Sequence, residues 1–151
     1  MQRNNRLSED VAREIMRQVV QAVGHCFAHG VFHGDLQSSN ILVNTDTLEV
    51  KLIDFGCSDL VSDFGRMGYI SCIWSLGLIL AEMICGDVYI ESSNKIIEKC
   101  SQFVSPECCQ LLSVCLQNPM EAPTFDEILN HSWFRQTLPR LPAPEDPGSS
   151  N

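Results

Sequence analysis

The stretch from Cys72 to Gly86 constrains the fold of this chain most, because its sequence, CIWSLGLILAEMICG, is apolar on every side. A helix of this kind is either buried on all sides within a protein or lies in lipid. Its uninterrupted apolar part is shorter than the roughly 20 residues that a bilayer crossing needs, and Ser75 and Glu82 interrupt it. We therefore expect a central helix covered by other elements, with a membrane span as the alternative.

The segment from Ser8 to His29 predicts a long amphipathic helix. Ser8 is a good N-cap, two acidic residues follow it in the first turn, and Gly30 is a typical stop. Apolar side chains recur at every fourth position, a helical period: Val11, Ile15, Val19 and Val23. This face should pack against the central helix.

Shorter elements are predicted on either side of the central helix. The apolar segments 41–44 and 48–53 read as a hairpin. Ser105-Pro106 is expected to open a helix that runs to Leu116, and Thr124 to Glu127 forms a capping box for another helix through Asn130. With 151 residues, 44% of them hydrophobic, the chain suits one globular domain. The predicted fold class is mainly α with a small β hairpin.

Two polar motifs flank the predicted hairpin: HGDLQSSN at residues 33–40 and KLIDFG at residues 51–56. Asp35 could accept a hydroxyl proton, and Asn40 could reach a cation on the same side of the loop. Asp54 would supply a second oxygen ligand, and Mg²⁺ prefers such hard donors together with phosphates and water. The alternative is that Asp35 and Asn40 are ordinary turn residues and that Asp54 merely follows a strand.

At this spacing the two motifs resemble the catalytic loop and the D-F-G metal loop of protein kinases. Among kinases the resemblance is to the Pim family of serine/threonine kinases, and it rests on five further runs: 50–56, 74–77, 83–87, 104–108 and 123–131. It implies a transferase that uses ATP and Mg²⁺ to phosphorylate proteins, with Asp35 as the base and with Asn40 and Asp54 as the nucleotide-linked metal ligands. It also implies the large, C-terminal lobe of the kinase fold over residues 8–136. Residues 1–7 would be an extension and 137–151 a disordered, Pro-rich tail.

The cationic parts of the kinase pattern are missing from these residues. The resemblance would place an Arg at Gly34 and a Lys at Gln37, and the 151 residues contain neither a G-x-G-x-x-G loop nor a V-A-I-K strand, the parts of the small lobe. Between Gly56 and Trp74 there is no A-P-E, and Ala122 stands where the Arg partner of that Glu would be. The segment is too short for a phosphorylatable loop and a peptide-docking loop, although a fully extended chain of this length could still bridge the gap. We expect little or no activity from this chain alone.

The net charge limits the classes of partner that we expect for this chain. The net charge of −9 argues against nucleic acid and anionic membrane surfaces, and it permits basic peptides. Glu82, Asp87 and Glu91 resemble the acidic positions that favour basic substrates in Pim-like kinases. The alternative is a solvated acidic surface.

Eight cysteines occur without a C-x-x-C pair, which predicts buried free thiols in a reducing compartment rather than a metal site or disulfides. The first residues lack an apolar signal region, so we expect a cytoplasmic or nuclear protein.

Three functional hypotheses follow. The chain is a kinase large lobe that is weak or inactive alone, a pseudokinase-like scaffold that binds proteins or basic peptides, or an incomplete product without a stable fold.

Overall fold

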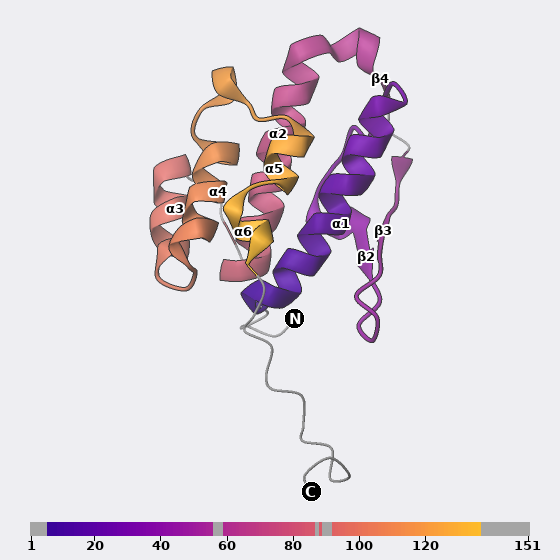
Figure 1. Cartoon of the computed structure of the whole chain (residues 1–151). Coiled ribbons are helices and arrows are strands. Elements are labelled where there is room, and N and C mark those ends of the chain that lie inside the picture. Colours follow the sequence, from indigo (N-terminus) through magenta and orange to yellow (C-terminus); the bar gives the residue numbers. More distant parts are fainter. Residues whose placement is uncertain (1–5, 56–58, 87, 89–91, 137–151) are drawn as a thin grey trace, which may run out of the picture.

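The computed structural model describes residues 6–55, 59–86, 88 and 92–136 as a helical bundle with two short two-stranded sheets (Figure 1). Residues 1–5 of the predicted extension at 1–7 and the predicted tail at 137–151 lie outside the described residues, whereas the Leu7 N–H donates to the Met83 carbonyl at 2.7 Å. In chain order the elements are α1 (Glu9–Ala28), β1 (Val31–Phe32), η1 (Ser38–Asn40), β2 (Ile41–Val43), β3 (Val50–Leu52), β4 (Asp59–Leu60), α2 (Val61–Cys85), α3 (Ser93–Ser101), α4 (Pro106–Leu116), η3 (Pro119–Glu121), α5 (Phe125–Leu129) and α6 (Ser132–Arg135).

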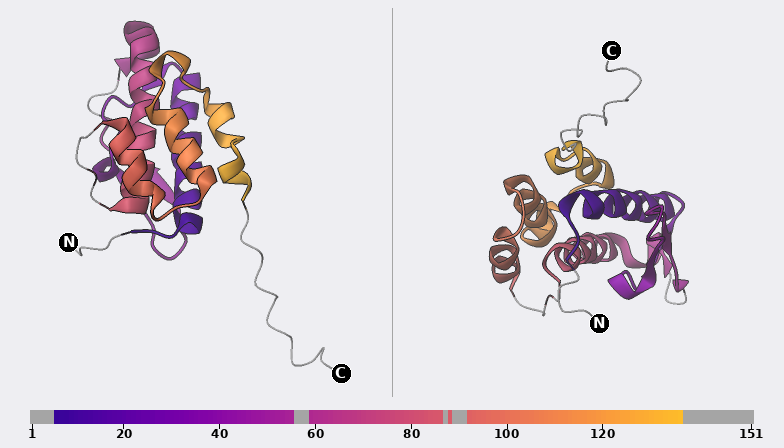
Figure 2. Two further views of the ribbon diagram at one scale, coloured as in Figure 1. Left: turned by 90° about the vertical axis from the view of Figure 1, so that its left-hand side faces the viewer. Right: turned by 90° about the horizontal axis from the view of Figure 1, so that it is seen from below.

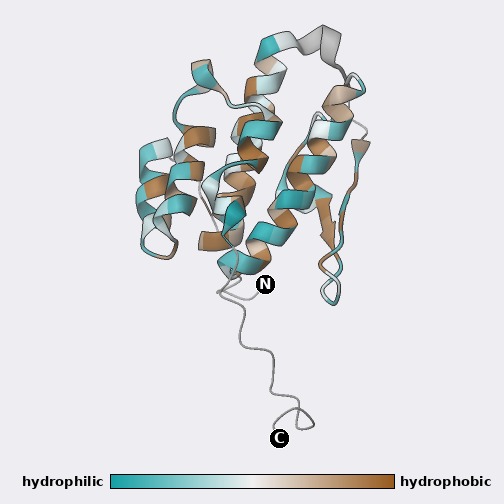
Figure 3. Ribbon diagram, viewed as in Figure 1, coloured by the Kyte–Doolittle hydropathy of each residue, from teal (hydrophilic) through white to brown (hydrophobic). Residues whose placement is uncertain are grey.

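Helix α1 begins and ends where its sequence signals predict. The Ser8 side chain accepts a hydrogen bond from the backbone N–H of Val11 at 3.3 Å, and Gly30 follows the helix with a positive φ of 83°. Teal and brown bands alternate along α1 in Figure 3, as expected for a helix with one buried face. The predicted face is inside the core.

Helix α2 is the central helix that the apolar run predicted. It lies between α4 on one side and α1 on the other (Figure 1, Figure 2). The side chains of its second half that are buried in the core are Ile73, Leu76, Ile79, Leu80, Ala81 and Ile84. By length and composition alone, the part from Gly65 to Cys85 could cross a membrane, and no other helix in the described ranges could. Here its apolar surface packs against α1, α3 and α4.

The segment before Trp74 had no predicted secondary structure. Helix α2 begins at Val61 and continues through a kink at Gly65, where φ is 53° and ψ is −139°. Glycine adopts this conformation without the steric cost of a Cβ. Most of the short segment before Trp74 is therefore part of the helix.

The two sheets are small and antiparallel. β2 pairs with β3 in the register Ile41 to Leu52, which confirms the predicted hairpin. β1 pairs with β4, a contact that was not predicted. Gln18 of α1 fixes the hairpin: its Oε1 accepts from the Val50 N–H at 2.9 Å and its Nε2 donates to the Leu48 carbonyl at 2.8 Å.

Helices α4 and α5 begin at the predicted caps. Ser105 caps α4, and Thr124 and Glu127 form the capping box of α5. Helix α3 was not predicted, because its nine residues alternate too briefly between apolar and polar types to stand out. The buried guanidinium of Arg13 contacts α6, the last helix of the described residues: its Nε donates to the Trp133 carbonyl at 2.7 Å.

The cysteines correct the sequence interpretation. The structure joins Cys85 and Cys100 in a disulfide, so the prediction of free thiols was wrong for this pair. The five other described cysteines are free, as predicted: Cys26, Cys72, Cys108, Cys109 and Cys115. Burial raises the pKa of the Cys72 and Cys115 thiols to about 12, which keeps them protonated and unreactive. The pair escaped prediction because sequence spacing does not reveal which helix ends meet.

Candidate functional site

The first polar motif lies in the loop between β1 and η1, at the end of α1. β1 leads directly into His33, and Gly34 then turns the chain with a φ of 90°. This turn places Asp35 beside the short helix that contains Asn40. The two residues that the sequence singled out are therefore brought together.

Two side-chain amides hold the carboxylate of Asp35. Nε2 of Gln37 donates to Oδ1 at 2.9 Å, and Nδ2 of Asn40 donates to Oδ2 at 3.1 Å and to the Asp35 carbonyl at 2.7 Å. Asn40 is only 6% exposed, so its amide is a fixed part of the loop, whereas Gln37 is exposed. The carboxylate is thus oriented by neutral donors from its own loop.

His33 joins this loop to the second motif. Its Nδ1 accepts from the Asp35 N–H at 3.2 Å, and its Nε2 lies 2.7 Å from the carbonyl oxygen of Ile53. A backbone N–H can only donate and a carbonyl can only accept, so these partners select the neutral ring with the proton on Nε2. The ring also packs against Phe55, with centroids 4.4 Å apart.

Asp54 follows β3 at the same end of the hairpin. The N–H of Ile53 donates to the Asn40 carbonyl at 2.9 Å, which places the chain before Asp54 beside the first motif. Asp54 has a positive φ of 62°, uncommon for a residue with a Cβ and frequent at functional loops. Its side chain is exposed and makes no hydrogen bond within the described part of the chain.

The charges around this site are acidic. The Ser38 hydroxyl donates to Oε2 of Glu82, which brings a carboxylate of α2 to the loop. Among the residues that the structure describes, no Lys or Arg forms an ion pair with Asp35 or Asp54. The other two predicted acidic positions, Asp87 and Glu91, lie outside the described residues.

The donors present fit Mg²⁺ only in part. Because Asn40 uses its Nδ2 for Asp35, its Oδ1 is left as a hard oxygen donor, and Asp54 offers a free carboxylate. Within the described ranges, no group of three or more His, Cys, Asp or Glu side chains could hold a metal ion. Phosphate and water oxygens would have to complete the coordination.

Sequence reasoning missed two partners of this site. It treated Gln37 only as the loss of a cation, although its amide contacts Asp35, and it did not connect Ser38 with Glu82. The spacing of two between Asp35 and Gln37 in a loop could have suggested the first contact, whereas 44 residues separate the second pair.

Parts of this chain are similar to known protein kinases. A family model described as "Protein kinase domain" matches residues 1–70, a range that includes the helix α1 and both motifs. The serine/threonine-protein kinase pim-2 of Danio rerio is 32% identical over 87% of this chain. The chain is therefore similar to protein kinases over these parts.

A second protein kinase is also similar to this chain. The carbon catabolite-derepressing protein kinase of Candida tropicalis is 31% identical over 93% of the chain. The aligned parts make up 50% of the zebrafish kinase and 28% of the Candida kinase, so the chain spans about half or less of the length of these relatives. The mainly helical structure with its small sheets is consistent with the large lobe of a kinase.

Proposed function

We propose that this chain forms the large lobe of a Pim-like serine/threonine protein kinase and has little or no phosphotransferase activity by itself. The observation that carries this proposal is the Asp35 carboxylate, which Gln37 and Asn40 hold beside the loop of Asp54. In this proposal Asp35 is the catalytic base, and Asn40 and Asp54 are the magnesium ligands. Bound Mg²⁺ would neutralise charge on the phosphates of ATP.

The weak activity follows from the side chain at position 37. A base that accepts a hydroxyl proton works best when a fixed cation faces the phosphoryl group as it moves. Gln37 offers only a neutral amide, and this amide already contacts Asp35. Loss of one preorganised charge costs about 3 kcal/mol of barrier lowering, or roughly a hundredfold in rate.

The segment after the second motif supports the same conclusion. Gly34 has no side chain to pair with a phosphorylated residue of this segment. Helix α2 begins at Val61, only a few residues beyond Gly56, and no A-P-E run lies between Gly56 and Trp74. A peptide substrate would therefore lack the docking loop that the family uses.

The proposed partners are proteins with basic segments. Glu82 contacts the catalytic loop through Ser38, and the net charge of −9 disfavours nucleic acid and anionic membranes. We also propose a cytoplasmic or nuclear site of action, because five of the described cysteines are free thiols, as is usual in a reducing compartment.

Titration calorimetry tests nucleotide binding directly. We expect no measurable heat when Mg-ATP is added to the purified chain, and the same result for Asp54→Asn. A micromolar dissociation constant for the wild-type chain that is lost in Asp54→Asn would overturn this part of the proposal. Binding that is equal in both proteins would exclude Asp54 as a ligand.

A second candidate is a pseudokinase-like scaffold that binds basic peptides. It is favoured by the exposed carboxylate of Asp54 and by the position of Glu82 at the same loop, since neither has a cationic partner in the described structure. Fluorescence anisotropy with an arginine-rich peptide tests it. Binding that weakens in Glu82→Gln supports the scaffold, and binding that is unchanged contradicts it.

The third hypothesis, a product without a stable fold, is tested by thermal unfolding followed by circular dichroism. The buried core around α2 leads us to expect one cooperative transition. A gradual loss of signal would instead favour an incomplete product.

A further inference from the structure

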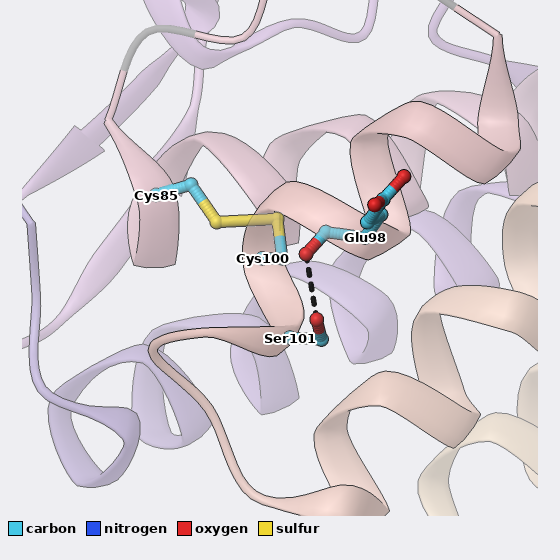
Figure 4. The surroundings of a disulfide bond; sticks show 4 residues. All are labelled: Cys85, Glu98, Cys100 and Ser101. Carbon is cyan, nitrogen blue, oxygen red and sulfur yellow. Dashed lines mark hydrogen bonds between the residues drawn. A yellow bond between two sulfur atoms is a disulfide. The ribbon is translucent and has the colours of Figure 1, made fainter.

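The ends of α2 and α3 are joined through sulfur. Cys85 is the last residue of α2, and Cys100 is the last but one of α3 (Figure 4). Their Cα atoms lie 5.6 Å apart, within the ordinary range for a disulfide. In Figure 4 the bridge lies beside the last turn of α3, where the Ser101 hydroxyl donates to the Glu98 carbonyl at 2.6 Å.

The two cysteines differ in their access to solvent. Cys85 is 9% exposed and is followed by Gly86, where the chain leaves the helix with a φ of 79°. Cys100 is fully buried, on the same face of α3 as Ile96. A reagent in solution can therefore reach the sulfur of Cys85 with a small local opening, but it reaches Cys100 only if α3 separates from the core.

We propose that Cys85 and Cys100 are a reversible thiol pair in which Cys85 exchanges with glutathione disulfide and Cys100 resolves the mixed disulfide. The pair would fix α3 to the end of α2 when oxidised and release this link when reduced. This inference is independent of the proposed kinase function.

The chemistry balances with glutathione disulfide as the oxidant. The thiolate of Cys85 attacks one sulfur of glutathione disulfide, forms a mixed disulfide and releases one glutathione thiolate. The thiolate of Cys100 then attacks the Cys85 sulfur and releases the second glutathione. The two protein thiols lose their protons and two electrons, and glutathione disulfide becomes two glutathione molecules.

The positions of the cysteines also set the rate. Both are at the C-terminal ends of helices, where the partial negative charge disfavours a thiolate. Exchange should therefore be slow, on the order of minutes to hours. The other described thiols provide an internal reference, because burial raises the pKa of Cys72 and Cys115 to about 12.

Mass spectrometry of digested protein tests the proposal. The reduced wild-type chain is incubated with glutathione disulfide under native conditions and then digested without reductant. We expect a cross-linked peptide pair that contains Cys85 and Cys100 and is lighter by two hydrogen atoms than the reduced pair. Cys100→Ser should accumulate glutathione on Cys85, whereas Cys85→Ser should leave Cys100 unmodified.

Two results would overturn the proposal. One is the absence of the cross-link in the wild-type chain after a small reference dithiol in the same solution has been completely oxidised. The other is modification of Cys100 in Cys85→Ser as fast as that of Cys85 in Cys100→Ser. Alkylation of the reduced wild-type chain gives an answer that needs no variant: Cys85 should react at least about tenfold faster than Cys100, and equal rates contradict the assigned order.

Discussion

Substitution of Gly77 by Ala tests the packing of α2 against α4, two helices that meet in the core. A Cβ at position 77 would lie 2.7 Å from Cδ2 and 2.9 Å from Cγ of Leu116, and 2.9 Å from Cβ of Cys115. Such overpacking costs about 1–3 kcal/mol. The Cys115 Cβ is attached to the α4 backbone and cannot rotate away, so we expect the upper part of this range.

The higher helix propensity of alanine offsets part of this cost. Alanine is about 1 kcal/mol more favourable than glycine inside a helix. The net expectation for Gly77→Ala is a loss of about 1–2 kcal/mol, which lowers the Tm of a chain of this size by about 3–6 °C. Thermal unfolding and urea unfolding, both followed by circular dichroism, measure the change independently.

The matched control is Gly24→Ala in α1. Its Cβ would lie 3.3 Å from Cγ of Phe125, at the edge of an aromatic ring that can shift by a few tenths of an ångström. The helix-propensity gain should offset this contact, so its stability should stay within about 0.5 kcal/mol of wild type. If Gly77→Ala were as stable as Gly24→Ala, the close approach of α2 and α4 would be refuted.

Arg13→Ala should lower the free energy of unfolding by about 2–4 kcal/mol, because a buried carbonyl of α6 loses its donor and an aromatic ring loses its cation; an unchanged urea midpoint would contradict this. Burial raises the pKa of the Cys72 and Cys115 thiols to about 12 from an unfolded value of 9.0, so stability should be complete below about pH 9 and fall as the pH rises toward 12. Urea midpoints at about pH 8 and about pH 10 measure this fall, which should be shallower in a Cys115→Ala variant. Gln18→Ala should speed hydrogen exchange of the Val50 amide about tenfold, since that amide loses its acceptor, and exchange at the wild-type rate would contradict the contact.

The parts of the fold that were predictable from sequence are those with strong local signals. Helix α1 was predictable from the Ser8 cap, from apolar side chains at every fourth position and from Gly30. The start of α5 was predictable from Thr124 and Glu127. In each case the side chains that determine the element lie within the element or beside its ends. Local physics was enough to place them.

The parts that were missed depend on contacts between distant residues. The helical start of α2 relies on a kink at Gly65, and β1 pairs with β4 across more than twenty residues. The Cys85–Cys100 disulfide likewise reflects how α2 and α3 meet. No short sequence pattern encodes such pairings.

The candidate site shows the same division. The sequence placed Asp35 and Asn40 in one loop, and the structure shows a hydrogen bond between their side chains. Their roles in phosphoryl transfer and the metal-binding role of Asp54 stay predictions. The second function of Gln37, as a donor to Asp35, became visible only when the loop conformation was known.

Transfer of radiolabelled phosphate from Mg-ATP to a basic serine-containing peptide tests directly whether this chain has phosphotransferase activity by itself. The wild-type chain and Asp35→Asn are compared at equal concentration, with an intact Pim-like kinase as the positive reference. We expect the wild-type chain to transfer no more radiolabelled phosphate to the peptide than Asp35→Asn does. Incorporation by the wild-type chain that disappears in Asp35→Asn would contradict it, because these residues would then form a working kinase site without the missing cations.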